Sequence, residues 1–188
     1  SPFAGLCMRT GRHWFICWRA CVHAALSGSL ASLTARSIPS LKSSTSIYGK
    51  RVACVGSGPA SLACAGYLAL EGCAVTVYEK RAVAGGLNVT GVAPYKMHAA
   101  SGSAEVEFIE SLGVTIRTGV TIGQDVSVAD LLAQHDAVFL GCGLGADATL
   151  DVPGTDGPGV HGAVAWIERM KLEPGYGLAG VTSAVVIG

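Results

Sequence analysis

The sequence predicts an α/β fold built on a parallel sheet. Two β-rich apolar runs, residues 52–55 and 74–78, flank a helical stretch at residues 59–69, and the turn Gly56-Ser57-Gly58 joins the first run to this helix. A third apolar run, residues 136–143, again ends in glycines. Continuous apolar runs of this length are typical of parallel strands that are covered on both faces. The order strand, glycine turn, helix, strand predicts a βαβ unit.

The turn has the composition of a phosphate-binding loop. Gly56 allows the strand to turn sharply, and Gly58 leaves room for a diphosphate at the helix N-terminus, where unpaired N–H groups attract anions. Pro59 suits the first helical turn, because its missing N–H deprives no carbonyl of a partner. Ser61 replaces the third glycine of the dinucleotide fingerprint and is small enough for close helix–strand packing. These residues predict a Rossmann-like dinucleotide site.

Glu79 supports this prediction, because it ends the second strand about 20 residues after Gly56, where dinucleotide-binding units carry an acid. A carboxylate at this position accepts hydrogen bonds from both hydroxyls of an adenosine ribose and repels a 2′-phosphate. We therefore expect an adenosine with a free ribose, from FAD or NAD. The alternative is a βαβ unit that binds no nucleotide, with Glu79 as a solvated strand end.

Composition indicates a globular domain without a polyanionic partner. The chain has 188 residues, of which half are apolar and 14% are charged, so it can build a substantial core. Its formal net charge of zero disfavours nucleic acid or a membrane surface as a partner. The seven cysteines, at positions 7, 17, 21, 54, 64, 73 and 142, include no CxxC pair, which favours a reducing compartment.

The first 50 residues differ from the rest, because they contain no Asp or Glu. They carry several arginines and many serines, a mixture that resembles an organellar transit peptide. The apolar stretch at residues 14–33 is interrupted by Arg19 and His23, so we expect no membrane span. We predict a cytoplasmic protein, with an organellar location as the alternative.

The remaining elements follow from periodicity and turn residues. The loop at residues 80–100 is long for a simple connection, and long loops in compact domains are usually functional. A helix is predicted at residues 103–112, with Val106, Ile109 and Leu112 on one face. Further elements are predicted downstream: one bent strand or two short strands at 113–123, a short helix capped by Ser127 through Leu132, a helix at 163–172 and a buried strand at 182–188.

Six motifs between Lys50 and Gly188 carry a family resemblance: "VGSGPASLACA", "VTVYEKRAVAGGL", "GVAPYKM", "VEFIESLGVTIRTGV", "DAVFLGCGLGA" and "VPGTDGPGVHGAVAWIERMK". In this order they resemble the flavoprotein part of dihydropyrimidine dehydrogenase and the small subunit of glutamate synthase, and details such as "GPASLACA" favour the pyrimidine branch. The resemblance implies a Rossmann-like FAD-binding domain of an NAD(P)H-dependent oxidoreductase. In such proteins NADPH reduces FAD, and electrons pass to iron–sulfur clusters on a partner domain or subunit.

The resemblance also implies the residues that contact FAD. It places the adenosine on Glu79, the diphosphate over the turn, and Gly86 and Leu87 near the flavin half. Lys96 stands where the family has an Arg or Lys that meets the phosphates, although a solvated loop lysine is the alternative. The backbone at 120–122 would lie against the adenine, and Gly141 and Gly143 are cofactor neighbours or plain turn residues. The candidate cofactor-binding residues are Gly56, Gly58, Pro59, Ala60, Ser61, Glu79, Lys80, Gly86, Leu87, Lys96, Thr121, Ile122, Gly141, Cys142 and Gly143.

The N-terminal segment "CWRACVHAAL" resembles the end of the family's cluster-binding stretch. Cys17 and Cys21 match its last two cysteines, but His13 stands at the preceding cysteine position and Cys7 is out of register. A four-iron cluster normally needs four thiolates. We therefore expect no 4Fe–4S cluster and no metal site in this chain, and we name no catalytic acid or base.

We divide the chain into an N-terminal extension (1–46, a degraded iron–sulfur-like or targeting segment), an FAD-binding domain (47–180) and the start of a truncated NAD(P)H-binding domain (181–188). Because residue 1 is not Met and the last strand echoes residues 52–56, we expect a fragment. One alternative function is a non-catalytic FAD-binding or subunit-contact module. A flavin-linked disulfide reductase is disfavoured, because no reactive cysteine pair follows Gly86.

Overall fold

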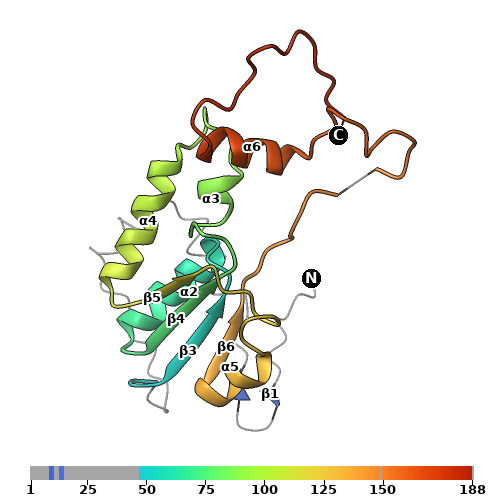
Figure 1. Cartoon of the computed structure of the whole chain (residues 1–188). Coiled ribbons are helices and arrows are strands. Elements are labelled where there is room, and N and C mark those ends of the chain that lie inside the picture. Colours follow the sequence, from blue (N-terminus) through green and yellow to red (C-terminus); the bar gives the residue numbers. More distant parts are fainter. Residues whose placement is uncertain (1–8, 11–12, 15–46, 149, 188) are drawn as a thin grey trace, which may run out of the picture.

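The computed structural model describes the backbone of residues 9–10 and 13–14, and residues 47–148 and 150–187. The strands form a six-stranded sheet in the order β1-β2-β6-β3-β4-β5 (Figure 1). The four longer strands, β3, β4, β5 and β6, run parallel to one another, and β2 is parallel to β6 while β1 is antiparallel to β2. Their bounds are β1 Arg9–Thr10, β2 His13–Trp14, β3 Arg51–Val55, β4 Ala74–Glu79, β5 Thr115–Thr118 and β6 Ala137–Leu140. The predicted α/β fold with a parallel sheet is confirmed.

Helices cover both faces of this sheet. Because successive strand residues point to opposite sides, each strand contributes side chains to a core on each face. Val52 and Cys54 lie in a core beneath α2 (Pro59–Leu70) and α4 (Ala99–Ser111). Ala53 and Val138 lie in a second core with Leu131 of α5 (Val128–Gln134). Both sheet faces are therefore apolar, which explains why the strands are continuous apolar runs in the sequence.

Two helices lie beyond the carboxyl ends of the parallel strands (Figure 1). These are the short α3 (Leu87–Thr90), inside the long loop, and α6 (Ala163–Leu172), which has no buried residue. Residues 141–148 and 150–162 form an extended arm between the end of β6 and α6. The described helices include none that is long and apolar enough to cross a membrane.

Most predicted elements are confirmed, with shifts of a few residues at their ends. The helix predicted at 103–112 begins four residues earlier, at Ala99, because His98 already has the extended backbone of an N-cap residue and Gly102 packs against α3. The stretch 113–123 contains one strand, β5, followed by an isolated bridge between Ile122 and Val126.

The buried strand predicted at 182–188 is wrong for the residues that the structure describes. Residues 181–187 form no strand, and the side chains of Val185, Val186 and Ile187 are exposed. A β-rich run becomes a strand only where a neighbouring strand accepts its hydrogen bonds, and none of the described strands pairs with it. The cluster-like cysteines Cys7, Cys17 and Cys21 lie outside the described residues.

Candidate dinucleotide-binding site

The turn between β3 and α2 is held in shape by the end of β6. Gly56 has φ +89°, and a Cβ at this position would lie 2.6 Å from the carbonyl oxygen of Gly141. Only glycine satisfies both constraints, the left-handed backbone and the close approach. The Gly141 N–H in turn donates to the carbonyl of Val55 over 2.9 Å, which continues the β3–β6 ladder up to the turn.

The N-terminus of α2 presents unpaired hydrogen-bond donors. Gly58 is the N-cap residue, no side chain caps the helix, and the first turn contains no acid. The N–H groups of Gly58, Ala60 and Ser61 have no hydrogen-bond partner among the described residues, whereas Leu62 N–H donates to the Gly58 carbonyl over 3.0 Å. A Cβ at Gly58 would meet only the Gly141 oxygen, at 3.9 Å. Free donors at the positive end of a 12-residue helix suit an anion.

Glu79 lies beside this turn and is only 7% exposed. Its Oε2 accepts hydrogen bonds from the N–H and the hydroxyl of Ser57, over 2.8 and 2.7 Å, and its Oε1 accepts one from the N–H of Arg81, over 2.9 Å. An ionised carboxylate has about four acceptor positions. Without movement, one position therefore remains, on Oε1, so the geometry favours one ribose hydroxyl rather than the two expected from the sequence.

Ser57 is the residue of this site that the sequence did not single out. Its hydroxyl donates to Glu79 and accepts a hydrogen bond from the N–H of Gly85 over 3.0 Å, and the residue is fully buried. In the sequence Ser57 is a small turn residue between two glycines. Its role depends on the approach of β4 and the 80–86 loop, and no local pattern encodes that approach.

The Gly85-Gly86 turn packs against the Gly58 end of the turn between β3 and α2. Gly86 has φ +55°, and a Cβ there would lie 2.6 Å from the Cα of Gly58. Leu87 follows as the first residue of α3 and is half exposed. The sequence prediction that Gly86 and Leu87 belong to the site thus agrees with their position beside the turn, although their contact with a cofactor stays a prediction.

Ser61 packs against the end of β6, as expected for a small residue at the third fingerprint position. A Cβ on Gly141 would collide with the Ser61 hydroxyl, and it would lie 2.9 Å from the ring of Phe139. The Ser61 hydroxyl is buried and has no hydrogen-bond partner among the described residues. After Gly141 in the chain, Cys142 is exposed and Gly143 has φ +69°.

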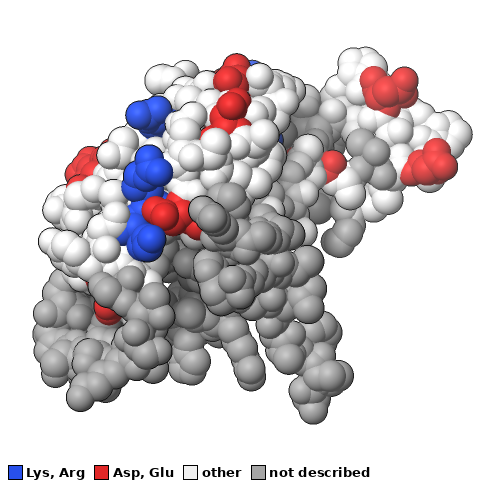
Figure 2. Space-filling view, turned by 90° about the horizontal axis from the view of Figure 1, so that it is seen from below, with Lys and Arg blue, Asp and Glu red and all other residues white. Residues whose placement is uncertain are grey.

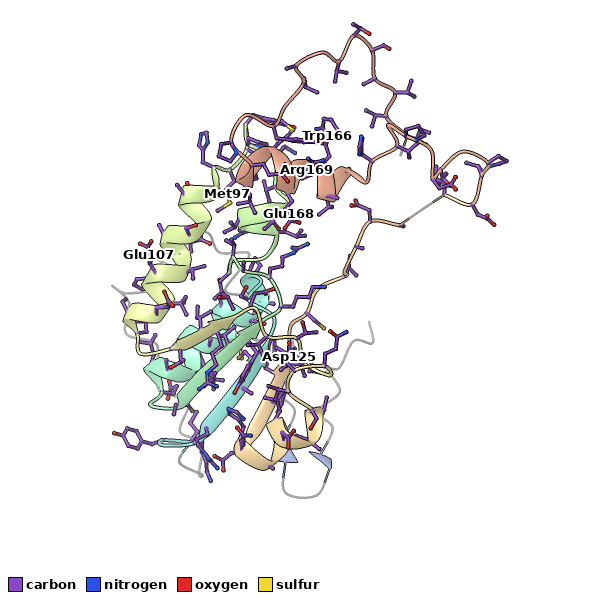
Figure 3. The ribbon with its side chains drawn as sticks, viewed as in Figure 1. Met97, Glu107, Asp125, Trp166, Glu168 and Arg169 are labelled. Carbon is purple, nitrogen blue, oxygen red and sulfur yellow. The ribbon has the colours of Figure 1, made fainter. Side chains whose placement is uncertain are left out.

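The other predicted residues lie at the border of this cluster or outside it. Lys80 is exposed, and Lys96 is exposed in the turn before α4, with its Nζ 5.7 Å from the centroid of the Tyr95 ring. The Thr121 N–H donates to Asp125 over 2.7 Å, and Ile122 packs on the second core. Figure 3 shows Asp125 beside the carboxyl ends of the strands. None of the described contacts joins Lys96 to the turn at residues 56–58.

A network of polar contacts links α6 to α3. Arg81 donates to the Thr90 hydroxyl over 3.2 Å and pairs with Glu168 at 3.1 Å, and Lys171 donates to the Asn88 carbonyl over 2.9 Å. Burial lowers the pKa of Lys171. Figure 3 shows that Glu168 lies on the side of α6 that faces α3. No local pattern predicts this network, because the partners that α6 contributes lie more than 80 residues from Arg81 and Asn88 in the chain.

On the face shown in Figure 2, charge does not gather into a patch of one sign among the described residues. In Figure 2, Lys and Arg side chains lie among Asp and Glu side chains on the visible face. Within the described part of the chain, no three His, Cys, Asp or Glu side chains are grouped closely enough to hold a metal ion. The distinctive chemistry of the site is therefore that of backbone donors and one buried carboxylate.

Residues 54–105 match the family model of the NAD(P)-binding Rossmann-like domain. This match begins in β3, includes the glycine turn and Glu79, and ends in α4. Sequence comparison and geometry thus agree on the class: the chain contains a Rossmann-like dinucleotide-binding unit.

Sequence relatives show that the chain belongs to a family of oxidoreductases with this Rossmann-like unit. It is 35% identical over 149 residues to the putative oxidoreductase AegA of Escherichia coli K12, which covers 74% of this chain and 22% of AegA. It is 33% identical over 130 residues to the glutamate synthase (NADPH) small chain of the same organism, covering 69% of this chain and 28% of that one. The resemblance to the glutamate synthase small subunit is confirmed, while the preference for the pyrimidine branch stays a prediction.

Among solved structures, the chain is similar to Mycobacterium tuberculosis FprA in complex with NADPH. The TM-score is 0.55 at 28% sequence identity, over 64% of this chain and 28% of that chain. The chain therefore spans between a fifth and a third of the length of these proteins.

Proposed function

We propose that the chain is the FAD-binding portion of an NAD(P)H-dependent oxidoreductase whose electrons pass to an iron–sulfur-bearing partner domain or subunit. The names of the relatives support the reaction class, since AegA is a putative oxidoreductase and the glutamate synthase small chain carries NADPH in its name. Because the chain matches only part of each relative, the activity, the final substrate and the partner are proposed for the larger protein.

The observation that carries this proposal is the pairing of free helix donors with a buried carboxylate. The N–H groups of Gly58, Ala60 and Ser61 can hold a diphosphate without a basic side chain. Glu79, fixed beside them, can accept a hydrogen bond from the adenosine ribose. Its negative charge disfavours a ribose that carries a 2′-phosphate, which supports FAD rather than NADPH at this particular turn.

The remaining residues are proposed to enclose the cofactor. Gly86 and Leu87 lie beside the turn, where they would meet the part of FAD beyond the diphosphate, and residues 141–143 border the same opening. Lys80, Lys96, Thr121 and Ile122 are proposed contacts at the periphery. Bound flavin would supply the hydride-accepting and electron-releasing chemistry, and these residues would supply binding and orientation.

The first experiment asks whether the chain binds FAD at the turn. We expect the purified chain to bind FAD and the Gly58→Leu variant to lose most of this binding, because the new side chain takes the space of the diphosphate. Gly177→Leu is the matched control, since no atom lies within 4 Å of a Cβ there and neither glycine has a positive φ. The measurement is flavin absorbance retained after gel filtration. A Gly58→Leu variant that retains flavin as well as the control would contradict the proposed site.

The second experiment separates an enzyme portion from a non-catalytic module. NADPH added to the FAD-loaded larger protein is expected to bleach the flavin absorbance, and an iron–sulfur partner is expected to restore it. Tight FAD binding without any bleaching by NADPH or NADH would favour the non-catalytic module instead.

A further inference from the structure

The hydroxyl of Ser57 connects two segments that the sequence keeps apart. It donates a hydrogen bond to Glu79 Oε2 at the end of β4, over 2.7 Å, and it accepts one from the N–H of Gly85, over 3.0 Å, in the turn before α3. Both contacts are buried, so water does not compete with them. One side chain therefore sets the distance between the carboxylate and the Gly85-Gly86 turn.

The consequences of losing this hydroxyl differ at its two ends. Glu79 would keep two hydrogen bonds, from the N–H groups of Ser57 and Arg81. Gly85 would instead be left with a buried N–H that has lost its acceptor, which is costly enough to shift the turn. Because Gly86 packs directly against Gly58, a shift of this turn changes the opening beside the helix N-terminus.

We propose that Ser57 is a positioning residue of the dinucleotide site, which couples the ribose-binding carboxylate to the Gly85-Gly86 turn. This inference rests on the proposed function, because it assigns Glu79 and Gly86 to one bound molecule. A ligand that reaches both segments, such as FAD, depends on their spacing. ADP carries the ribose and the diphosphate but nothing that would extend along Gly86 and Leu87, so it depends mainly on Glu79 and the helix donors.

The test compares two ligands and two serine variants of the full 188-residue chain. Isothermal titration measures the Kd of FAD and of ADP for the unchanged chain, Ser57→Ala and Ser111→Ala. Ser111 is the matched control, because its hydroxyl bonds only to the Phe108 carbonyl at the exposed end of α4. For Ser57→Ala we expect the Kd of FAD to rise about tenfold or more and the Kd of ADP to rise clearly less. Ser111→Ala is expected to bind both ligands normally.

The ratio of the two losses distinguishes positioning from general damage. A loosened fold would weaken FAD and ADP alike, so equal losses would overturn the coupling, as would an unchanged Kd for FAD. Circular dichroism and the thermal midpoint establish that each variant is folded. If Ser57→Ala does not fold, Ser57→Cys, which keeps the shape of the side chain with a somewhat larger atom and hydrogen-bonds weakly, is titrated in its place.

The same data separate this inference from the proposed function. If the unchanged chain binds neither FAD nor ADP, the dinucleotide site itself is refuted, and the role of Ser57 falls with it. If the unchanged chain binds both ligands and the Ser57 variants bind them with the same Kd values as the unchanged chain, the site stands and only the coupling is refuted.

Discussion

Single residues set the shape of the phosphate-binding turn, and each small residue there has its own reason. Gly56 is confined by the carbonyl of Gly141, whereas Gly58 has open space in front of it. The Ser61 side chain occupies the space that a Cβ on Gly141 would need. The motif predicts small residues at all three positions, but only the structure separates steric necessity at Gly56 from the access required at Gly58.

The steric confinement of Gly56 predicts a larger loss of stability there than at a glycine with a similar φ and open space around it. Gly56→Ala is expected to lower the free energy of unfolding by about 2 kcal/mol or more, because the residue needs a positive φ and its Cβ would overlap the Gly141 oxygen. Gly113→Ala is the control, with φ +93° but no atom within 4 Å of a Cβ, so it isolates the backbone cost. Urea unfolding of both variants measures the difference, and equal losses would show that the contact with β6 is not tight.

Glu79 and Ser57 mark how far residue-level prediction reaches. The spacing along the chain predicts that Glu79 ends a strand and lies close to the turn at residues 56–58. The number of its free acceptor positions does not, because it depends on how the neighbouring Ser57 and Arg81 orient their donors. Sequence patterns predicted which residue types meet, but hydrogen-bond saturation is a property of the folded arrangement.

At the scale of elements, α6 is held at its N-terminus by a residue from the arm. Asp147 accepts hydrogen bonds from the N–H groups of Val164, over 2.9 Å, and Ala165, over 3.1 Å, while the N-cap residue Gly162 has no side chain to do so. These backbone donors hold the pKa of Asp147 below its ordinary value. The arm and the helix are thus fastened to each other at this point.

The Asp147 cap predicts a pH dependence of α6. A carboxyl group with a lowered pKa in the folded state stabilises above its unfolded pKa, near 3.9, and this contribution is lost as the pH falls through the lower folded value. We therefore expect the α6 amides to lose protection near and below this range, so that their exchange rates rise relative to those of an unfolded chain at the same pH. At neutral pH, Asp147→Ala is expected to show the same faster exchange, measured by hydrogen-exchange mass spectrometry of residues 163–172.

Asp156→Ala is the control for this experiment, because Asp156 is an exposed acid of the same arm with no hydrogen bond to α6 among the described contacts. Exchange of α6 that is unaffected by Asp147→Ala would show that the helix end is held by other contacts.

Elements were predictable where their signal is local. The bounds of α6 and the Ser127 cap of α5 are as predicted, since Ser127 accepts from the Asp130 N–H over 3.0 Å within one helical turn. The long-range Asp147 cap was not predicted, because its partners come together only in the folded chain. The strand expected at 182–188 failed for a related reason: apolar β-rich composition supplies no hydrogen-bond partner.

At the scale of the whole molecule, the candidate site lies at the carboxyl ends of the parallel strands, where open α/β sheets bind ligands. The described residues include four cysteines, which differ in their burial. Cys54, Cys64 and Cys73 are buried, whereas Cys142 is exposed next to the opening. Burial is the main cause that raises the pKa of Cys73, with smaller effects from Glu71 and Asp136.

Thiol modification therefore provides a test of the whole arrangement. With iodoacetamide at neutral pH, we expect Cys142 to react quickly in the native chain and the three buried cysteines to react only after unfolding. Bound FAD is expected to slow the reaction of Cys142, because residues 141–143 border the proposed site. Peptide mass spectrometry measures each position, and Cys142→Ser confirms the assignment. Fast labelling of Cys54 in the native chain would contradict the described core.

The contact between Gly56 and the end of β6 also has a consequence for biosynthesis. The first strand, its turn and α2 are made early, but the carbonyl that borders the turn belongs to a residue that is made much later. The ligand-holding shape is therefore finished only when β6 has emerged from the ribosome and inserted between its neighbours. Nascent chains that stop before Gly141 would carry the complete glycine motif and still lack a fully formed candidate dinucleotide-binding site.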